Sequence, residues 1–471
     1  MTQVTSMVLV PYPAHGHITP MLRLARALRS LGITSIVALP DFMHRNYNST
    51  DDQVIIEPIP SGFKENDDAK DFFSIDASME KIMPGNLERI VRELEFAGGV
   101  ACLVVDLLAS WAVGVGQRCG VQVAGFWPAM FATYRVVFAI PELILNGFIS
   151  ECGIPILHHH HKINQDIILE RDLLTSNQAK LSTKDLPWLV GEPSSQKSRF
   201  AFWLRVINRT RSLPWILINS FPKEDNNKIT ILPSLLSNHQ LQTFHVGPLM
   251  LSINDKKILM NNINNSSNKK EHDKSIIQWL EKQEPCTVIY ISFGTWVGPI
   301  AKEKIIELAM ALEEAKRPFL WVLKEEKQWR EGLPEGYLDR NAKKGKVVAW
   351  APQEEVLKFQ AVGCYLTHCG WNSTMEAIRH EKRLLCYPIS GDQFVNCNYI
   401  VGVWGIGIKL EGLERGVILD GIEKIMVGRE AEMIQKKVSE MKVRVMGDEE
   451  ICATASNLES FVEVVREANS G

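Results

Sequence analysis

The stretch that decides the fold runs from Trp350 to Gln393 and reads WAPQEEVLKFQAVGCYLTHCGWNSTMEAIRHEKRLLCYPISGDQ. Apolar runs at 347–350, 364–369 and 384–388 predict buried strands, and the segments between them have helical spacing. After the middle strand the chain turns into a predicted helix over 372–379. Because a helix N-terminus presents free N–H groups and the positive end of the helix dipole, this turn suits a phosphate group. The alternation of strand and helix predicts an α/β fold with a parallel sheet.

The start of the chain shows the same alternation. A short apolar strand at 8–12 leads into a turn rich in Pro, Gly and His, and apolar residues at helical spacing follow as far as Gly32. A second strand at 33–40 completes a predicted βαβ unit. Ligands of such sheets gather at the carboxyl ends of the strands, so we expect the turn at 13–20, which contains His17, to face a cleft.

A carboxylate stands at the end of another predicted strand, in the run LVVDLL at 103–108. Asp106 is either the N-cap of the helix-like segment that follows or the partner of a nearby base. The spacing of the residues does not decide between these two roles.

Length, composition and charge limit the class of protein. With 471 residues, 45% of them hydrophobic and 23% charged, the chain is long enough for two domains with their own cores. A formal charge of -3 disfavours nucleic acid as a partner. Nine Cys residues without a disulfide framework fit a reducing compartment. The sequence shows neither a signal peptide nor an apolar run of membrane-spanning length, so we expect a soluble, cytoplasmic monomer with no membrane span.

A polar, Asn-rich segment divides the chain. The residues 251–275 include few large apolar side chains, and this composition predicts an interdomain linker. It separates an N-terminal domain, 1–250, from a second domain of alternating strands and helices, 276–450.

The stretch 350–393 resembles, in order and spacing, the signature box of the plant family-1 UDP-glycosyltransferases, which move a sugar from a UDP-sugar to a small acceptor. The matching positions are Trp350, Pro352, Gln353, Leu357, Thr367, His368, Cys369, Gly370, Trp371, Asn372, Ser373, Glu376, Pro388, Asp392 and Gln393. Two departures occur: Phe359 replaces the usual His, and Glu381-Lys382-Arg383 replaces the usual Gly-Val-Pro. We expect both in connecting turns, where they would alter stability or loop shape rather than chemistry.

The resemblance implies the GT-B fold, in which two Rossmann-like parallel-sheet domains face a cleft and a C-terminal helix, here within 451–471, packs back on the N-terminal domain. It implies that UDP-sugar, a co-substrate, is bound without any cofactor or metal. The implied UDP-sugar-binding residues are Thr295, Trp350, Ala351, Gln353, His368, Trp371, Asn372, Ser373, Glu376, Asp392 and Gln393. In relatives, Gln at the last of these positions usually accompanies UDP-glucose, so glucose is the expected sugar.

The PxxGHxxP pattern at 13–20 resembles the family's N-terminal motif, in which the His after Gly is the catalytic base. That residue is His17 here, and the family's Asp that orients the base corresponds to Asp106. The pair implies an inverting reaction, in which His17 takes the proton of an acceptor hydroxyl and the oxygen attacks the anomeric carbon.

The less regular segments 41–98 and 131–211 are expected to build the pocket for a small apolar or aromatic acceptor, because binding sites commonly form on loops above a sheet. Residues that could line this pocket, or equally belong to the core, are Met79, Met83, Trp127, Met130, Phe131 and Trp188. The run His158–His161 is expected in a solvated loop rather than at a metal site.

Two other classes of protein remain open. A nicotinamide-dependent oxidoreductase could also contain two α/β halves, but no GxGxxG motif follows the first predicted strand. A catalytically inactive protein that only binds a nucleotide sugar is the second alternative, and the presence of both His17 and Asp106 argues against it.

Overall fold

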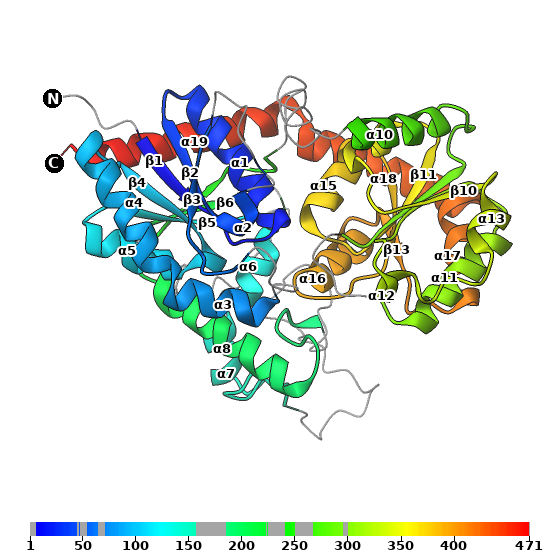
Figure 1. The fold of residues 1–471 in the computed structure, drawn as a ribbon, viewed down its shortest axis with the longest axis horizontal. Coiled ribbons are helices and arrows are strands. Elements are labelled where there is room, and N and C mark those ends of the chain that lie inside the picture. The colour runs from blue at the N-terminus through cyan, green and yellow to red at the C-terminus, as the bar shows by residue number, and fades with distance from the viewer. Residues whose placement is uncertain are drawn as a thin grey trace.

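Two parallel sheets organise the protein, one in each half of the chain (Figure 1). The computed structural model describes residues 6–44, 47, 54–64, 71–156, 185–222, 224, 241–249, 267–294 and 300–470, with the side chains of helix α10 from 273 onward. The strand orders are β3-β2-β1-β4-β5-β6-β7 in the seven-stranded sheet and β10-β9-β8-β11-β12-β13 in the six-stranded sheet. All neighbouring strands are parallel. The predicted α/β class with two domains is confirmed.

The strands are three to seven residues long. The first sheet contains β1 Ser6–Val10, β2 Thr34–Pro40, β3 Ile55–Ile59, β4 Cys102–Asp106, β5 Val123–Trp127, β6 Trp215–Ile218 and β7 Gln242–His245. The second contains β8 Val288–Ser292, β9 Phe319–Val322, β10 Gly345–Val348, β11 Val362–Thr367, β12 Arg383–Cys386 and β13 Gly407–Lys409.

Helices connect the strands and cover both sheets (Figure 1). In the first domain they are α1 His15–Ser30, α2 Asp41–His44, α3 Phe72–Lys81, α4 Met83–Ala97, α5 Trp111–Cys119, α6 Phe131–Phe138, α7 Ile140–Leu145 and α8 Pro193–Thr210. In the second they are α10 Ser267–Leu280, α11 Lys302–Glu314, α12 Lys327–Arg330, α13 Tyr337–Asn341, α14 Gln353–Lys358, α15 Trp371–Arg379, α16 Gln393–Asn398, α17 Arg415–Met426 and α18 Gly428–Met446, and α19 Asp448–Ala468 ends the chain.

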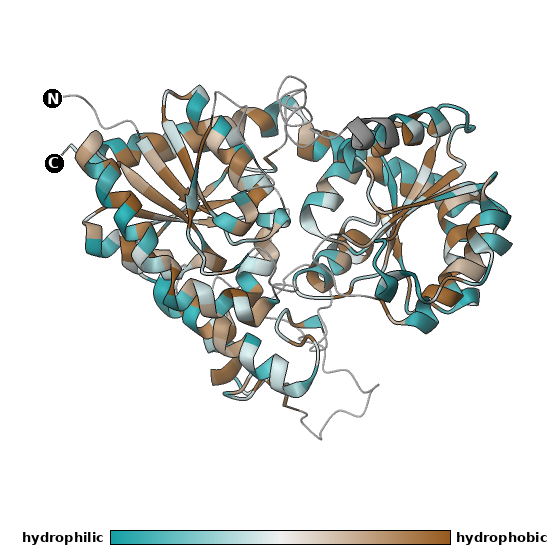
Figure 2. Ribbon diagram, in the orientation of Figure 1, coloured by the Kyte–Doolittle hydropathy of each residue, from teal (hydrophilic) through white to brown (hydrophobic). Residues whose placement is uncertain are grey.

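The central strands of both sheets are buried on both faces, which explains why they read as continuous apolar runs. In β1, Met7 and Leu9 belong to one hydrophobic cluster while Val8 and Val10 belong to another. This alternation is the two-residue period of a strand that is covered on both sides. Figure 2 shows the apolar colouring of the strands in both sheets.

Several element boundaries differ from the predicted ones. The strands of the deciding stretch begin at Gly345, Val362 and Arg383, one or two residues before the predicted positions. Arg383 therefore lies in β12, and its predicted place in a connecting turn is wrong. Helix α10 begins at Ser267, so regular structure starts inside the segment 251–275 that was expected to be a linker.

The last helix crosses from the second domain to the first (Figure 1). The ring of Phe461 in α19 packs edge-on against Trp215 of β6 and near Phe244 of β7, with centroid distances of 6.4 and 5.7 Å. Nearby, Asn457 Nδ2 donates to the carbonyl oxygen of His245 at 2.9 Å. Apolar packing and hydrogen bonding together fix α19 against the outer strands of the N-terminal sheet.

Candidate active site

The two residues predicted as a catalytic pair meet at the carboxyl edge of the first sheet. Because β1 and β4 are neighbouring parallel strands, the turn after β1 lies beside the end of β4. Helix α1 places His17 in its first turn, and β4 ends at Asp106. His17 Nδ1 and Asp106 Oδ2 are 2.8 Å apart, and the Asp106 side chain is fully buried.

Asp106 also serves as a helix cap. Its Oδ1 accepts a hydrogen bond from the backbone N–H of Leu108 at 3.0 Å, at the start of the short 3₁₀ helix Leu107–Ala109. Both roles considered from the sequence are therefore present in one carboxylate. The cap holds one oxygen in place, and this fixes the position of the oxygen that faces His17.

Two opposing effects act on the imidazole of His17. Burial disfavours the charged ring, but the charge and hydrogen bond of Asp106, together with the charge of Asp392, outweigh it and raise the pKa of His17 above 6.5. The neighbouring His15 has a different environment, because its Nδ1 bonds to the hydroxyl of Tyr47 and burial lowers its pKa. Of these two histidines, only His17 has a carboxylate on Nδ1.

His368 is held between two glycines at the end of β11. A Cβ atom at Gly294 would lie 2.7 Å from His368 Nε2, and a Cβ at Gly370 would lie 2.5 Å from the same atom, so a larger residue at either position would displace the imidazole. Burial lowers the pKa of His368 to about 4. At neutral pH this imidazole is uncharged and can act toward an anion only as an N–H donor. Thr295, which follows Gly294, lies outside the described residues.

A hydrogen-bond network centres on Gln353 at the start of α14. Its Nε2 donates to Ser373 Oγ at 2.9 Å and to Glu376 Oε2 at 2.8 Å, and its Oε1 accepts from Tyr365 Oη at 2.8 Å. Trp350 and Ala351 come just before it, after β10. Three predicted UDP-sugar residues from two helices are thus joined in one network.

Arg23 in the other domain reaches this network, and the sequence did not reveal it. Its NH2 group lies 3.5 Å from Glu376 Oε1, both side chains are nearly buried, and NH1 donates to the carbonyl oxygen of Leu249 at 3.0 Å. Burial raises the pKa of Glu376, while Arg23 and the hydrogen bond from Gln353 favour its charged form. The only signal in the sequence is a cation among the buried positions of α1.

Asn372 and Trp371, at the N-terminus of α15, also bond to the first domain. Pro20 has no N–H, so the carbonyl of Gly16, four residues earlier in α1, lacks its usual helical partner. Asn372 Nδ2 donates to that oxygen at 2.9 Å. Trp371 Nε1 donates to the carbonyl oxygen of Asn219 at 2.7 Å, which commits the one side-chain N–H that it could offer to a sugar.

Helix α16 lies on the side of the second domain that faces the first (Figure 1). Asp392 is its N-cap and Gln393 its first residue. Asp392 Oδ2 accepts from Asn396 Nδ2 at 2.9 Å, and burial raises the pKa of this carboxyl. Gln393 Oε1 accepts from the N–H groups of Ile389 and Ser390, both at 2.9 Å, so its Nε2 points away from that turn. The electrostatic effect of Asp392 on His17 shows that this end of α16 lies near the His-Asp pair.

Comparison with known proteins identifies the family. The profile described as UDP-glucoronosyl and UDP-glucosyl transferase matches residues 242–429. The chain is 46% identical to UDP-glycosyltransferase 82A1 of Arabidopsis thaliana, over 95% of this chain and 96% of that protein. The chain belongs to the plant family-1 UDP-glycosyltransferases. Another relative is DIMBOA UDP-glucosyltransferase BX9 of Zea mays, at 31% identity over 93% of this chain and 90% of that protein.

Solved structures of UDP-glycosyltransferases share the fold. UDP-glucose: anthocyanidin 3-O-glucosyltransferase in complex with UDP aligns with a TM-score of 0.78 at 24% identity, over 99% of this chain and 100% of that one. Os79 from O. sativa in complex with UDP aligns with a TM-score of 0.78 at 22% identity, over 98% and 100%. The predicted GT-B fold is confirmed.

Family membership settles the enzyme class. The chain is a UDP-glycosyltransferase, which uses a UDP-sugar as co-substrate. The alternative of a nicotinamide-dependent oxidoreductase is therefore wrong. Within the described part of the chain, no helix is long and apolar enough to cross a membrane.

The residues predicted to line the acceptor pocket are all buried, which agrees with the core interpretation of each. They are Met79, Met83, Trp127, Met130, Phe131 and Trp188. The two indole N–H groups are used within the protein: Trp127 Nε1 donates to the Met130 oxygen at 2.9 Å, and Trp188 Nε1 to the Gly153 oxygen at 2.8 Å. A role in acceptor binding stays a prediction for these residues. The run His158–His161 lies outside the described residues.

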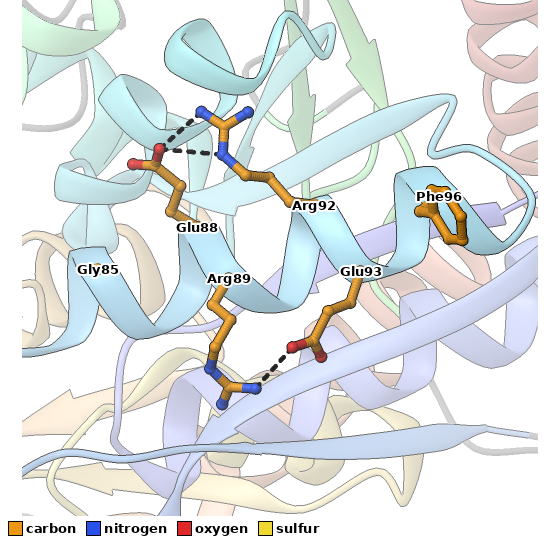
Figure 3. Close-up of a pocket in the computed structure, with 6 residues that line it drawn as sticks. All are labelled: Gly85, Glu88, Arg89, Arg92, Glu93 and Phe96. Carbon is orange, nitrogen blue, oxygen red and sulfur yellow. Dashed lines mark hydrogen bonds and ion pairs between the residues drawn. The ribbon is translucent and has the colours of Figure 1, made fainter.

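An open hollow on helix α4 is separate from the predicted site residues (Figure 3). Its lining is mostly two ion pairs along the helix, Glu88 with Arg92 and Arg89 with Glu93, beside the almost fully exposed ring of Phe96. None of these side chains belongs to the hydrogen-bond network around Gln353. Surface ion pairs of this kind contribute little to the stability of the fold.

The two departures from the family's signature box are connected in space. Lys382 is buried, and its Nζ donates to the carbonyl oxygens of Phe359 at 2.8 Å and Val362 at 3.1 Å. Glu381 has a positive φ of 55°, and its carboxylate accepts from Ser439 and Lys442 of α18, both at 2.8 Å. The altered positions thus tie the turn before β12 to α14, β11 and α18.

Proposed function

We propose that the protein transfers glucose from UDP-glucose to a hydroxyl group of a small apolar or aromatic acceptor, with inversion at the anomeric carbon. The observation that carries the proposal is the 2.8 Å contact between His17 Nδ1 and buried Asp106 Oδ2. An orienting carboxylate on Nδ1 leaves Nε2 as the nitrogen that can take a proton. This arrangement favours a catalyst over a protein that only binds nucleotide sugar.

The proposed base can receive a proton without becoming an isolated buried charge. Asp106 and Asp392 both favour the imidazolium form of His17. The acceptor oxygen attacks the anomeric carbon as its proton passes to His17, and the bond between sugar and UDP breaks on the opposite face. General-base assistance of this kind typically contributes about 10²- to 10⁴-fold in rate.

The departing diphosphate needs stabilisation, and the second domain supplies donors for it. The N-terminus of α15 presents its backbone N–H groups, Ser373 lies in its first turn, and neutral His368 is held beside it by Gly294 and Gly370. The carboxylate of Glu376, one turn further along, is suited to the ribose hydroxyls. Preorganised donors of this type are commonly the largest electrostatic contribution to such reactions.

The acceptor class is the least constrained part of the proposal. A matched relative is named for DIMBOA, and a structure that shares the fold is named for anthocyanidin. These names differ, so likeness at this level does not select one acceptor. A screen of phenolic, flavonoid, terpenoid and acidic acceptors with UDP-glucose and mass detection is the direct way to identify it.

The test of the base compares two nearby histidines. His17→Ala should lower turnover by about 10²- to 10⁴-fold while UDP affinity, measured by calorimetry, stays unchanged. His15→Ala is the matched control, since His15 bonds Tyr47 and has no carboxylate partner among the described residues. Equal turnover in the wild type and the His17 variant would refute the proposed base.

A further inference from the structure

Three buried cysteines from separate elements meet in the second domain. Cys369 precedes α15, Cys386 ends β12, and Cys397 lies in α16. Their Sγ atoms all lie within 4.8 Å of one another, and all three side chains are almost completely inaccessible to solvent. We call them the thiol cluster. Among the residues that the structure describes, it is the one group whose side chains are close enough to share a metal ion.

The geometry of the cluster is near that of a metal site. Three thiolates bound to one tetrahedral ion at about 2.3 Å would have sulfur atoms about 3.8 Å apart. Sulfurs within 4.8 Å of one another therefore need to move by about an ångström or less. The sulfurs of Cys369 and Cys386 make long contacts to backbone oxygens, 3.8 Å to Thr367 and 3.9 Å to Leu384, and such weak hydrogen bonds oppose this movement little.

The backbone holds Cys369 in place. Its φ is +66°, a left-handed conformation that costs a non-glycine residue roughly 1–2 kcal/mol. Hydrogen bonds compensate: its N–H donates to Thr367 Oγ1 at 3.1 Å, and its carbonyl accepts from Asn396 Nδ2 at 2.9 Å. The second bond comes from the residue beside Cys397, so two corners of the cluster are linked through the backbone.

Buried thiols are also common as plain core residues, and this chain contains one for comparison. Cys364 on β11 is fully buried but does not belong to the cluster. A variant of Cys364 therefore tests the effect of losing a buried thiol that lies outside the thiol cluster. The soft sulfur ligands favour thiophilic ions such as Zn²⁺ or Cd²⁺ over Mg²⁺ or Ca²⁺.

We propose that the thiol cluster binds one thiophilic divalent cation and that the bound ion weakens UDP-glucose binding, the second part resting on the proposed function. Each thiol loses its proton to solvent as its sulfur binds the ion. Three thiolates and a divalent ion have a net charge of -1, whereas three thiolates and a monovalent ion would have a net charge of -2. Burial disfavours the larger charge more strongly. This negative charge lies beside the N-terminus of α15, where the anionic diphosphate is proposed to bind, and it would repel that group.

The test starts from a protein in which the exposed cysteines Cys152, Cys286 and Cys452 are replaced by Ser, which removes competing surface thiols. Titration with Cd²⁺ should show one ion per chain and the ultraviolet charge-transfer absorption of Cd–S bonds. Cys386→Ser in this background should weaken binding by more than about 100-fold, since loss of an outer-shell partner alone often costs 10- to 100-fold. Cys364→Ser is the matched control and should leave Cd²⁺ binding unchanged.

X-ray absorption of the Cd²⁺ complex provides a measurement that needs no cluster variant. A shell of three sulfurs is expected, and a shell of oxygen and nitrogen would overturn the site even if Cys386→Ser fails to fold. Absence of binding, or equal binding by Cys386→Ser, would overturn it as well.

Calorimetry with UDP-glucose separates the two parts of the proposal. Cd²⁺ should weaken UDP-glucose binding to the background protein, and unchanged affinity would refute the coupling. If UDP-glucose fails to bind the metal-free protein, the proposed function is wrong instead, and the sulfur shell of Cd²⁺ still decides the metal site.

Discussion

Lys382 allows a quantitative test of a buried cation, because it occupies a position where relatives usually carry an apolar residue. Burial lowers the pKa of its ammonium group from 10.5 to about 8. This difference corresponds to about 3 kcal/mol of folding free energy that the charged form loses relative to the unfolded chain. The ammonium group also donates hydrogen bonds to the carbonyl oxygens of Phe359 and Val362.

The sign of the pH dependence follows from the lowered pKa. Below pH 8 the folded and unfolded chains both hold the proton, so the full cost is present. As pH rises from 8 toward 10.5 the folded chain releases the proton first, and the folded state gains stability. Between pH 7 and pH 10 the expected gain from Lys382 is about 2.5 kcal/mol.

The measurement compares wild type with Lys382→Met by urea unfolding at both pH values. From pH 7 to pH 10, the unfolding free energy of the wild type should rise by about 2.5 kcal/mol relative to that of Lys382→Met. The change of this difference with pH is the test, since Met also removes two hydrogen bonds at every pH. Lys436→Met, at a largely exposed lysine, is the control and should show no such change. A difference that stays constant from pH 7 to pH 10 would refute the account of a desolvated ammonium.

Three further predictions concern the site. Asp106→Asn should lower the pKa of His17, because Asp106 raises it. The acid limb of the pH profile of kcat/KM should then move to lower pH, and the plateau value should fall. An acid limb that does not move would contradict the pairing of His17 with Asp106. Arg23→Met should destabilise the protein by about 3–5 kcal/mol, because Glu376 keeps a buried charge without its partner. Adding Glu376→Gln should restore part of the lost melting temperature. If the losses of the two single variants add up in the double variant, Arg23 and Glu376 do not interact. Gly294→Ala, at a φ of +80°, should lower UDP affinity in calorimetry, because its methyl group would meet an imidazole nitrogen at 2.7 Å; unchanged affinity would show that this contact is unimportant.

The sequence predicted those parts of the site that depend on local order along the chain. A strand followed by a turn and a helix places His17 and Asp106 at the same edge of a parallel sheet, whatever the rest of the molecule does. The two roles of Asp106 could not be separated by spacing, because one carboxylate has two oxygens and the structure uses both.

Contacts between the domains could not be predicted in this way. Arg23 reads as a helical residue among apolar neighbours, and its pairing with Glu376 depends on how one domain is placed against the other. The same holds for Trp371, which was predicted to bind the UDP-sugar and whose indole N–H donates to the carbonyl oxygen of Asn219 in the other domain. Lys382 was expected in a connecting turn, and the pattern of the chain did not show which carbonyl groups lie within reach of its amine.

The proline of the N-terminal motif has a thermodynamic consequence for the contact between the two domains. Because Pro20 cannot donate, the Gly16 oxygen is open to Asn372, which uses one of its two amide hydrogens there. The second hydrogen is then the one that remains for the predicted role of Asn372 in UDP-sugar binding. If this bond raises affinity for the nucleotide, then by linkage the bound nucleotide stabilises the bond between Asn372 and the first domain by the same free energy.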